Sequence, residues 1–207
     1  PHLAESYEVS DDGLTYTFKL REGVLFHNGR EMVADDVRYT FERVFDPATQ
    51  SPGQGFYTTI EGAQEFIDGE ADSVAGIEVV DDYTIRFTTS EPDASFLHKL
   101  GLNFAHIVPQ EAVEAAAGDF GHNPVGTGGF MFKEWVLGQR LVLERNPNYF
   151  EEGLPYLDEI TFQVGVDPNV AFLRLLQGEV DVIGDGIPSA RYTEVMDDPQ
   201  LSQQVAM

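Results

Sequence analysis

Histidines are the residues in this chain whose type most directly suggests metal or acid–base chemistry. The five histidines, His2, His27, His98, His106 and His122, form neither a His-x-x-x-His pattern nor a helical His/carboxylate pair, so a zinc site has weak support. The chain contains no cysteine, which excludes disulfides, thiolate metal sites and a cysteine nucleophile. There is also no Gly-x-Ser-x-Gly motif to present a serine nucleophile.

Carboxylates offer a second kind of chemistry. Three pairs, Asp11-Asp12, Asp81-Asp82 and Asp197-Asp198, could act as paired acids or bind calcium. Each pair lies in a turn context and no calcium-loop pattern surrounds it, so we interpret all three as turn residues.

A carboxylate-based hydrolase is the alternative from a different functional class. Glu42, Glu61 and Glu65 are the helical carboxylates that it could use, and all three fall on polar faces. Such an enzyme would need two carboxyl groups about 5–10 Å apart in one pocket. The sequence shows no catalytic constellation, and we expect neither an enzyme nor a bound cofactor.

A glycine-rich stretch, Gly126-Thr127-Gly128-Gly129, could in principle hold a phosphate group. The third position of a dinucleotide fingerprint would be Met131 rather than glycine, and no Gly-Lys-Ser/Thr follows. The stretch also leads into a strand, so no helix N-terminus faces an anion. We therefore expect a structural turn and no nucleotide site.

Composition narrows the possible partners. The 207 residues include 36 acidic and 12 basic side chains, which give a formal net charge of -24. Such a field repels nucleic acid and anionic membranes, so we expect no nucleic-acid partner. Salt adaptation and codon bias both explain an acidic, lysine-poor surface. At 42% hydrophobic residues the chain can form a core, and no apolar run is long enough to span a bilayer.

Hydrophobic periodicity predicts the elements that must position any site. The clearest is a helix over 33–45, in which Val37, Phe41, Val44 and Phe45 share one apolar face. Asp167-Pro168 predicts a capped helix start, and Val170, Leu173 and Leu176 are expected to be its buried stripe. Further helices are expected at 60–67, 94–100, 109–117 and 189–196, and strands at 15–21, 76–80, 84–88, 102–108, 130–135, 141–145, 160–166 and 180–183.

The order of these elements predicts a mixed α/β fold. Hairpins with short helices fill the first half, whereas strands and helices alternate in the second. A subdomain boundary is expected near residues 107–109.

Several ordered motifs resemble family 5 solute-binding proteins, which serve ABC transporters for peptides, nickel and related ligands. The resemblance rests on residues 3–18, 23–29, 34–43, 76–77, 81–84, 124–132, 143–149 and 177–181. It is collinear and runs essentially from end to end. Val33, where relatives usually carry a threonine helix cap, departs from the pattern and should cost about 1 kcal/mol of helix stability. Gly129, where many relatives carry proline, also departs.

The resemblance implies a periplasmic-binding-protein-like lobe of mixed α/β type, with residues 1–107 as an extra subdomain and 108–207 as part of the core subdomain. The second lobe would lie outside this chain, which we expect to be a processed or truncated piece. The side chains that hold peptide termini in relatives lie largely in that lobe.

The implied function is capture of a di- or oligopeptide between two lobes and its delivery to permease subunits. Nickel complexes, sugars or opines are alternatives within the family, and a stand-alone interaction protein is an alternative outside it. The location would be periplasmic or at the cell surface, with any membrane contact through an anchor outside this chain. The resemblance places Leu102, Asn103, Phe104, Ala105, Gly184, Asp185, Gly186 and Ile187 on the ligand cleft. The competing interpretation of both segments is packing or hinge structure.

Overall fold

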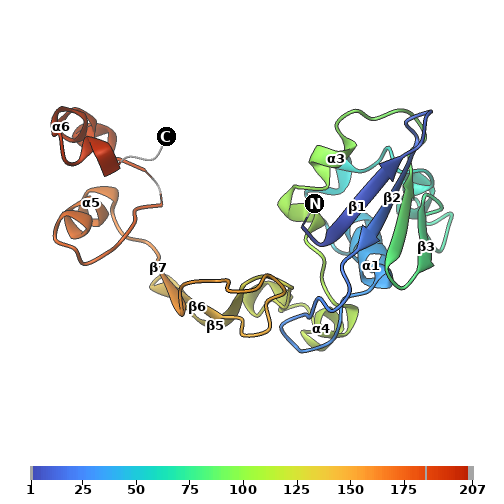
Figure 1. The fold of residues 1–207 in the computed structure, drawn as a ribbon, viewed down its shortest axis with the longest axis horizontal. Coiled ribbons are helices and arrows are strands. Elements are labelled where there is room, and N and C mark those ends of the chain that lie inside the picture. The colour runs from blue at the N-terminus through green and yellow to red at the C-terminus, as the bar shows by residue number, and fades with distance from the viewer. Residues whose placement is uncertain (1, 185, 205–207) are drawn as a thin grey trace. The chain divides into compact units, whose positions relative to one another are not determined.

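Two antiparallel hairpins build the main sheet. The computed structural model describes residues 2–184 and 186–204. It pairs β1 (Ala4–Val9), β2 (Thr15–Leu20), β4 (Thr84–Thr88) and β3 (Ile77–Asp81) in the order β1-β2-β4-β3 (Figure 1). The strand predicted over 15–21 and the 76–88 hairpin are confirmed. The periodicity did not reveal β1, because five of its six residues are exposed and its apolar pattern is weak.

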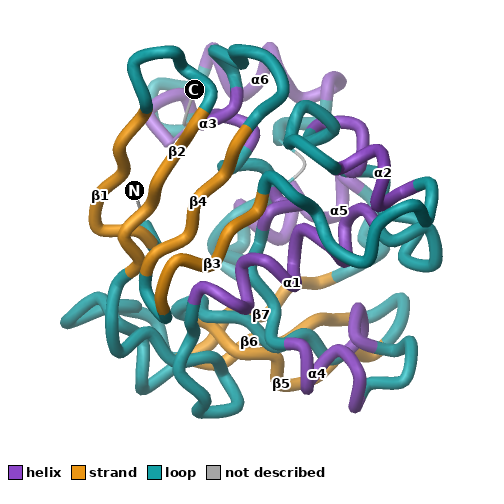
Figure 2. The backbone as a smooth tube through the Cα atoms, turned by 90° about the vertical axis from the view of Figure 1, so that its right-hand side faces the viewer, coloured by secondary structure: helices purple, strands orange, loops and turns teal. Residues whose placement is uncertain are grey.

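Helix α1 (Ala34–Phe45) packs against β3 and β4 and carries the centre of the core (Figure 2). Its predicted face is confirmed, since Val37, Phe41, Val44 and Phe45 are all buried. Each fully buried aromatic side chain contributes a large apolar area, so this face is the main source of stability for the sheet.

Asp36 and Arg30 stabilise the start of α1, because the residue at the N-cap position cannot. Val33 occupies that position in extended backbone and has no polar side chain to accept a hydrogen bond. The Asp36 carboxylate compensates in part by accepting from the Val33 N–H at 2.9 Å. Arg30 donates to both oxygens of the same carboxylate. A buried acid in the first turn is thus paired and also favoured by the helix dipole.

Three short helices follow the expected order: α2 (Ala63–Ile67), α3 (Phe96–Lys99) and α4 (Gln110–Ala115). The strand predicted over 102–108 is wrong, because residues 103–105 form a 3-10 turn. Phe104, Ala105 and Ile107 pack against the core rather than forming part of a strand. No helix in the described part of the chain is long and apolar enough to cross a membrane.

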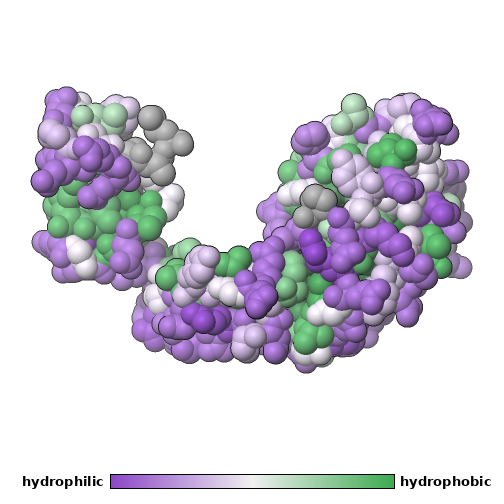
Figure 3. Space-filling model, in the orientation of Figure 1, coloured by the Kyte–Doolittle hydropathy of each residue, from purple (hydrophilic) through white to green (hydrophobic). Residues whose placement is uncertain are grey.

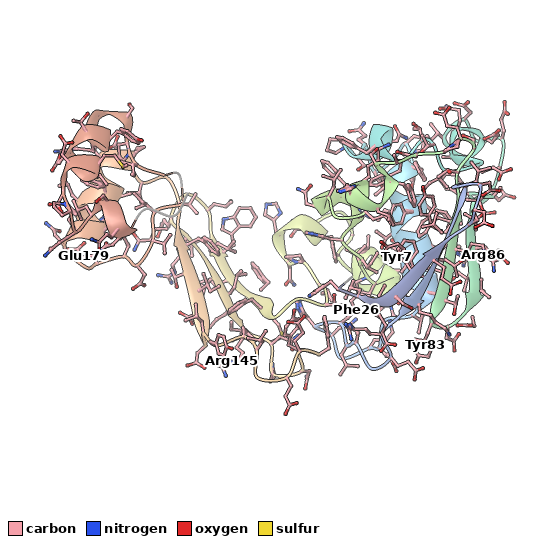
Figure 4. The ribbon with its side chains drawn as sticks, turned by 45° about the horizontal axis from the view of Figure 1, so that its top comes forward. Tyr7, Phe26, Tyr83, Arg86, Arg145 and Glu179 are labelled. Carbon is pink, nitrogen blue, oxygen red and sulfur yellow. The ribbon has the colours of Figure 1, made fainter. Side chains whose placement is uncertain are left out.

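A second sheet has the order β5-β6-β7, formed by β5 (Phe130–Val136), β6 (Arg140–Arg145) and β7 (Glu159–Gln163). This confirms the predicted 130–145 hairpin and the strand that follows it. Arg145 braces the loop before β7 by donating to the carbonyls of Tyr156 at 2.8 Å and Leu157 at 3.2 Å (Figure 4). The chain divides into two compact units, one of residues 1–133 with 142–160 and one of residues 134–141 with 161–207. The subdomain boundary expected near residues 107–109 stays a prediction.

The second unit contains α5 (Pro168–Leu176) and α6 (Tyr192–Asp197). Asp167 caps α5 as predicted, because its carboxylate accepts from the N–H groups of Asn169 at 2.9 Å and Val170 at 3.3 Å. The expected buried stripe of α5 is wrong: Val170, Leu173 and Leu176 are 43–44% exposed. Apolar surface accordingly gathers over α5 (Figure 3). Phe172 supplies the buried side chain of α5 instead.

The strand predicted over 180–183 is also wrong. These residues are irregular, and Val182 is 79% exposed. A strand needs a partner for its N–H and C=O groups, and the sheets among the described residues offer none here.

Candidate functional site

The first predicted segment, Leu102–Ala105, forms one turn directly after α3. The N–H of Leu102 donates to the carbonyl of Lys99 at 3.0 Å, and the N–H of Ala105 donates to the carbonyl of Leu102 at 3.0 Å. Asn103 is exposed, whereas Leu102, Phe104 and Ala105 are half-buried. These backbone bonds bring the four residues together on the end of α3, with Asn103 outermost.

Asp93 holds α3, and with it this turn, in place. Its carboxylate accepts from Lys99 Nζ at 2.6 Å, from Ser95 Oγ at 2.7 Å and from Thr59 Oγ1 at 3.2 Å. Burial alone would raise the pKa of Asp93, but the hydrogen bonds from Lys99 and Ser95 outweigh it and hold the pKa at about 2. Tyr16 also donates from its hydroxyl to the Asp93 carbonyl at 3.0 Å.

Asp93→Asn is expected to lower the free energy of unfolding by about 1–2 kcal/mol at neutral pH. A carboxyl whose folded-state pKa is depressed stabilises the fold above its ordinary pKa, and this contribution is lost as the pH falls from about 4 to about 2. The difference between the native chain and the variant in urea unfolding should therefore shrink across that interval. Glu134→Gln is the control, because its ion pair with Arg140 is exposed and worth little. A difference for Asp93→Asn that does not change with pH would contradict this account.

The second predicted segment, Gly184–Ile187, lies in the second unit. Gly186 and Ile187 line a cavity of about 610 Å³ together with side chains of α5 and α6, such as Phe172 and Val195. Asp185 lies outside the described residues, and Gly184 is not among the lining residues. Gly186 has φ +78°, a backbone conformation that favours glycine. Apolar side chains and polar groups both line the cavity, and Asp181 is the carboxylate among its described lining residues.

Sequence reasoning missed the two side chains that organise the Gly126–Gly129 loop. The Gly126 N–H donates to His27 Nδ1 at 3.3 Å, which leaves the proton on Nε2 to donate to the Gly128 carbonyl at 2.9 Å. Asn146, which is 3% exposed, donates from Nδ2 to the same carbonyl at 3.0 Å. The loop is therefore a tied structural turn, as predicted. His27, the loop and Asn146 belong to the 23–29, 124–132 and 143–149 motifs, which meet here. That these three motifs occur together in the sequence was the one indication of the contact.

A charged cluster joins α4 to the start of α1. Arg30 donates to Glu111 at 2.8 and 3.1 Å as well as to Asp36, and Asn28 Nδ2 donates to Glu111 at 2.8 Å. The hydrogen bonds from Arg30, reinforced by Asn28, lower the pKa of Glu111 to about 2. All the charges are paired, so the cluster acts as a structural clamp.

The carboxylates nominated for a hydrolase line neither the cavity beside Gly186 and Ile187 nor a second cavity of about 260 Å³, which is lined by residues such as His27 and Met131. Glu42 is half-buried, which raises its pKa, and it accepts from the Val74 N–H at 3.4 Å. Glu61 and Glu65 are both exposed and lie outside both cavities. No group of three or more potential metal ligands occurs within residues 2–184 and 186–204.

Comparison with known proteins places the chain in a family. The sequence profile described as "Bacterial extracellular solute-binding proteins, family 5 Middle" matches residues 1–206. Di/tripeptide-binding protein 4 of Pseudomonas aeruginosa is 33% identical over 98% of this chain and 38% of its own length. Heme-binding protein A of Haemophilus influenzae is 36% identical over 88% of this chain and 35% of its own length.

Solved structures of related proteins support the same family. A periplasmic oligopeptide-binding protein from Borrelia burgdorferi superposes with a TM-score of 0.90 and 30% identity, over 96% of this chain and 41% of its own. The chain thus spans about two fifths of the length of the relatives that it matches. The expected periplasmic-binding-protein-like lobe is confirmed by this superposition. The chain belongs to family 5 of the bacterial extracellular solute-binding proteins.

Proposed function

We propose that this chain is part of the substrate-binding component of an ABC-type uptake transporter, and that its solute is a di- or oligopeptide. The observation that carries the proposal is the alignment of 98% of the chain with di/tripeptide-binding proteins at 33–35% identity. The complete protein would capture the peptide between two lobes that close by hinge motion, and would then deliver it to the permease subunits.

The proposed contacts from this chain are the turn Leu102–Ala105 and the segment Gly184–Ile187. The exposed Asn103 supports the first, because a carboxamide can both donate to and accept from a peptide group. The cavity lined by Gly186 and Ile187 supports the second, since solute sites are concave and combine apolar side chains with a few polar groups.

The family description and the periplasmic relatives support an extracytoplasmic location. We place the protein in the periplasm or on the cell surface, with any membrane anchor outside residues 1–207. It acts as a carrier and catalyses no reaction.

The chain by itself is expected to bind peptides no more tightly than millimolar, because the groups that hold peptide termini would lie on the opposing lobe. A longer polypeptide that includes that lobe is expected to retain a peptide through purification. Calorimetry with a pool of di- and tripeptides tests the chain, and mass spectrometry of the bound material tests the longer protein. Sub-micromolar binding by the chain would contradict the need for a second lobe.

The same mass spectrum tests the nature of the solute. Recovery of heme, the ligand named for one relative, or of a nickel complex, sugar or opine would replace peptide as the solute while leaving the transport role intact.

A further inference from the structure

A pair of stacked phenylalanine rings lies partly in solvent beside the Leu102–Ala105 turn. The rings of Phe56 and Phe104 have centroids 5.6 Å apart and planes 18° apart. The neighbouring core aromatics, such as Phe41 and Phe87, instead meet edge to face and are fully buried. Phe56 is 44% exposed, so one part of its ring is open to a ligand.

The loop that carries Phe56 is held in a defined conformation. Gly53 allows the Phe104 ring to approach its backbone, because a Cβ atom there would lie 2.4 Å from Phe104 Cγ. The Phe56 N–H donates to the Gly53 carbonyl at 3.1 Å, and Gln54 Nε2 donates to the Phe45 carbonyl at 3.0 Å. The exposed ring is therefore pre-organised, which reduces the entropic cost of binding to it.

Asn103 adds a hydrogen-bonding side chain next to the rings. It directly precedes Phe104, is exposed, and its carboxamide makes no hydrogen bond to another residue within 2–184 and 186–204. The backbone carbonyl of Asn103 is already used by the His106 N–H at 3.4 Å, so the carboxamide is the group available to a ligand. An apolar platform with an adjoining amide matches one residue of a peptide: the platform takes its side chain and the amide takes its peptide group.

We propose that Phe56, Phe104 and Asn103 form a subsite that favours an aromatic or other large apolar side chain of the bound peptide over a charged one. This inference rests on the proposed peptide-binding function and names the part of the peptide that this unit recognises.

The test uses the isotopically labelled chain and two probes, the tripeptides Ala-Phe-Ala and Ala-Glu-Ala, followed by amide NMR shifts at millimolar peptide. Ala-Phe-Ala is expected to shift the amides of Phe56, Asn103 and Phe104, and Ala-Glu-Ala to shift them less. Phe56→Ser should weaken the apparent affinity for Ala-Phe-Ala about three- to tenfold, the value of one aromatic pair. Because Phe56 is half exposed, this variant is expected to keep the fold, which its amide spectrum verifies directly.

Tyr156→Ser is the matched control, since Tyr156 is an 84% exposed aromatic residue on a loop braced by Arg145 and remote from the turn in sequence. It should leave the binding of Ala-Phe-Ala unchanged. Equal binding of both tripeptides, or a Phe56→Ser affinity equal to that of the control, overturns the subsite. Absence of shifts with either tripeptide also overturns it, whereas the proposed function is judged separately by the ligand that the longer protein retains.

Discussion

Phe41→Ala is expected to lower the free energy of unfolding of the first unit by about 3–5 kcal/mol. The Phe41 side chain is 1% exposed, and its ring meets those of Tyr57 and Phe87, each with centroids 5.1 Å away. Truncation removes buried apolar area and leaves a cavity that these rigid neighbours cannot fill. The loss is a large fraction of the total stability of a typical domain, so partial unfolding in mild denaturant should be visible.

Urea unfolding followed by near-ultraviolet circular dichroism measures this effect. Leu137→Ala provides the control, because Leu137 is 71% exposed and its truncation should change the unfolding midpoint little. Phe41→Leu should fall between the two, since it keeps most of the buried volume. A loss below about 1 kcal/mol for Phe41→Ala would show that the core is not centred on this ring.

Gly76→Ala should destabilise the same unit by about 2–3 kcal/mol, although it adds only one methyl group. A Cβ at Gly76 would lie 2.5 Å from the Thr88 carbonyl oxygen and 2.8 Å from the Glu61 nitrogen and oxygen. These atoms are backbone and already bonded: the Gly76 N–H donates to the Glu61 carbonyl at 2.7 Å, and the Thr88 N–H donates to the Gly76 carbonyl at 2.8 Å. The methyl group can be accommodated only by stretching these bonds.

Gly121→Ala is the matched control, because no heavy atom lies within 4 Å of its added Cβ and its φ is not in the left-handed region. Its unfolding midpoint should equal that of the native chain within error. Hydrogen exchange at the Thr88 amide adds a local readout, and Gly76→Ala should speed that exchange more than exchange in α1. Equal midpoints for the two variants would refute the close backbone approach at Gly76.

Local patterns predicted the helices well. The apolar face of α1 and the Asp167 cap of α5 were both predicted because helical hydrogen bonds join residues four apart, so the periodicity of neighbouring residues carries the information. The hairpins at 76–88 and 130–145 were predicted for a similar reason, since each strand lies next to its partner in sequence. The ordered motifs also indicated the family, which the comparisons then confirmed.

The sequence predicted which segments form the candidate site, but not which side chains contact one another there. The resemblance nominated Leu102–Ala105 and Gly184–Ile187, and their contact with a solute stays a prediction. Phe56 was not predicted, because its stacking on Phe104 joins residues 48 positions apart and depends on the missing side chain at Gly53. The links from His27 and Asn146 to the glycine loop were missed for the same reason.

The sequence by itself determined the family, most of the helices and hairpins, and the absence of cysteine chemistry. Only the tertiary structure decided that 102–108 forms a turn instead of a strand, that 180–183 stays irregular, and that one face of α5 is exposed. A strand needs hydrogen-bond partners, and an apolar stripe needs a surface that covers it. Both come from other parts of the chain, so whether a strand or a buried stripe forms depends on which distant segments lie beside it. A residue's own neighbours in sequence cannot specify that.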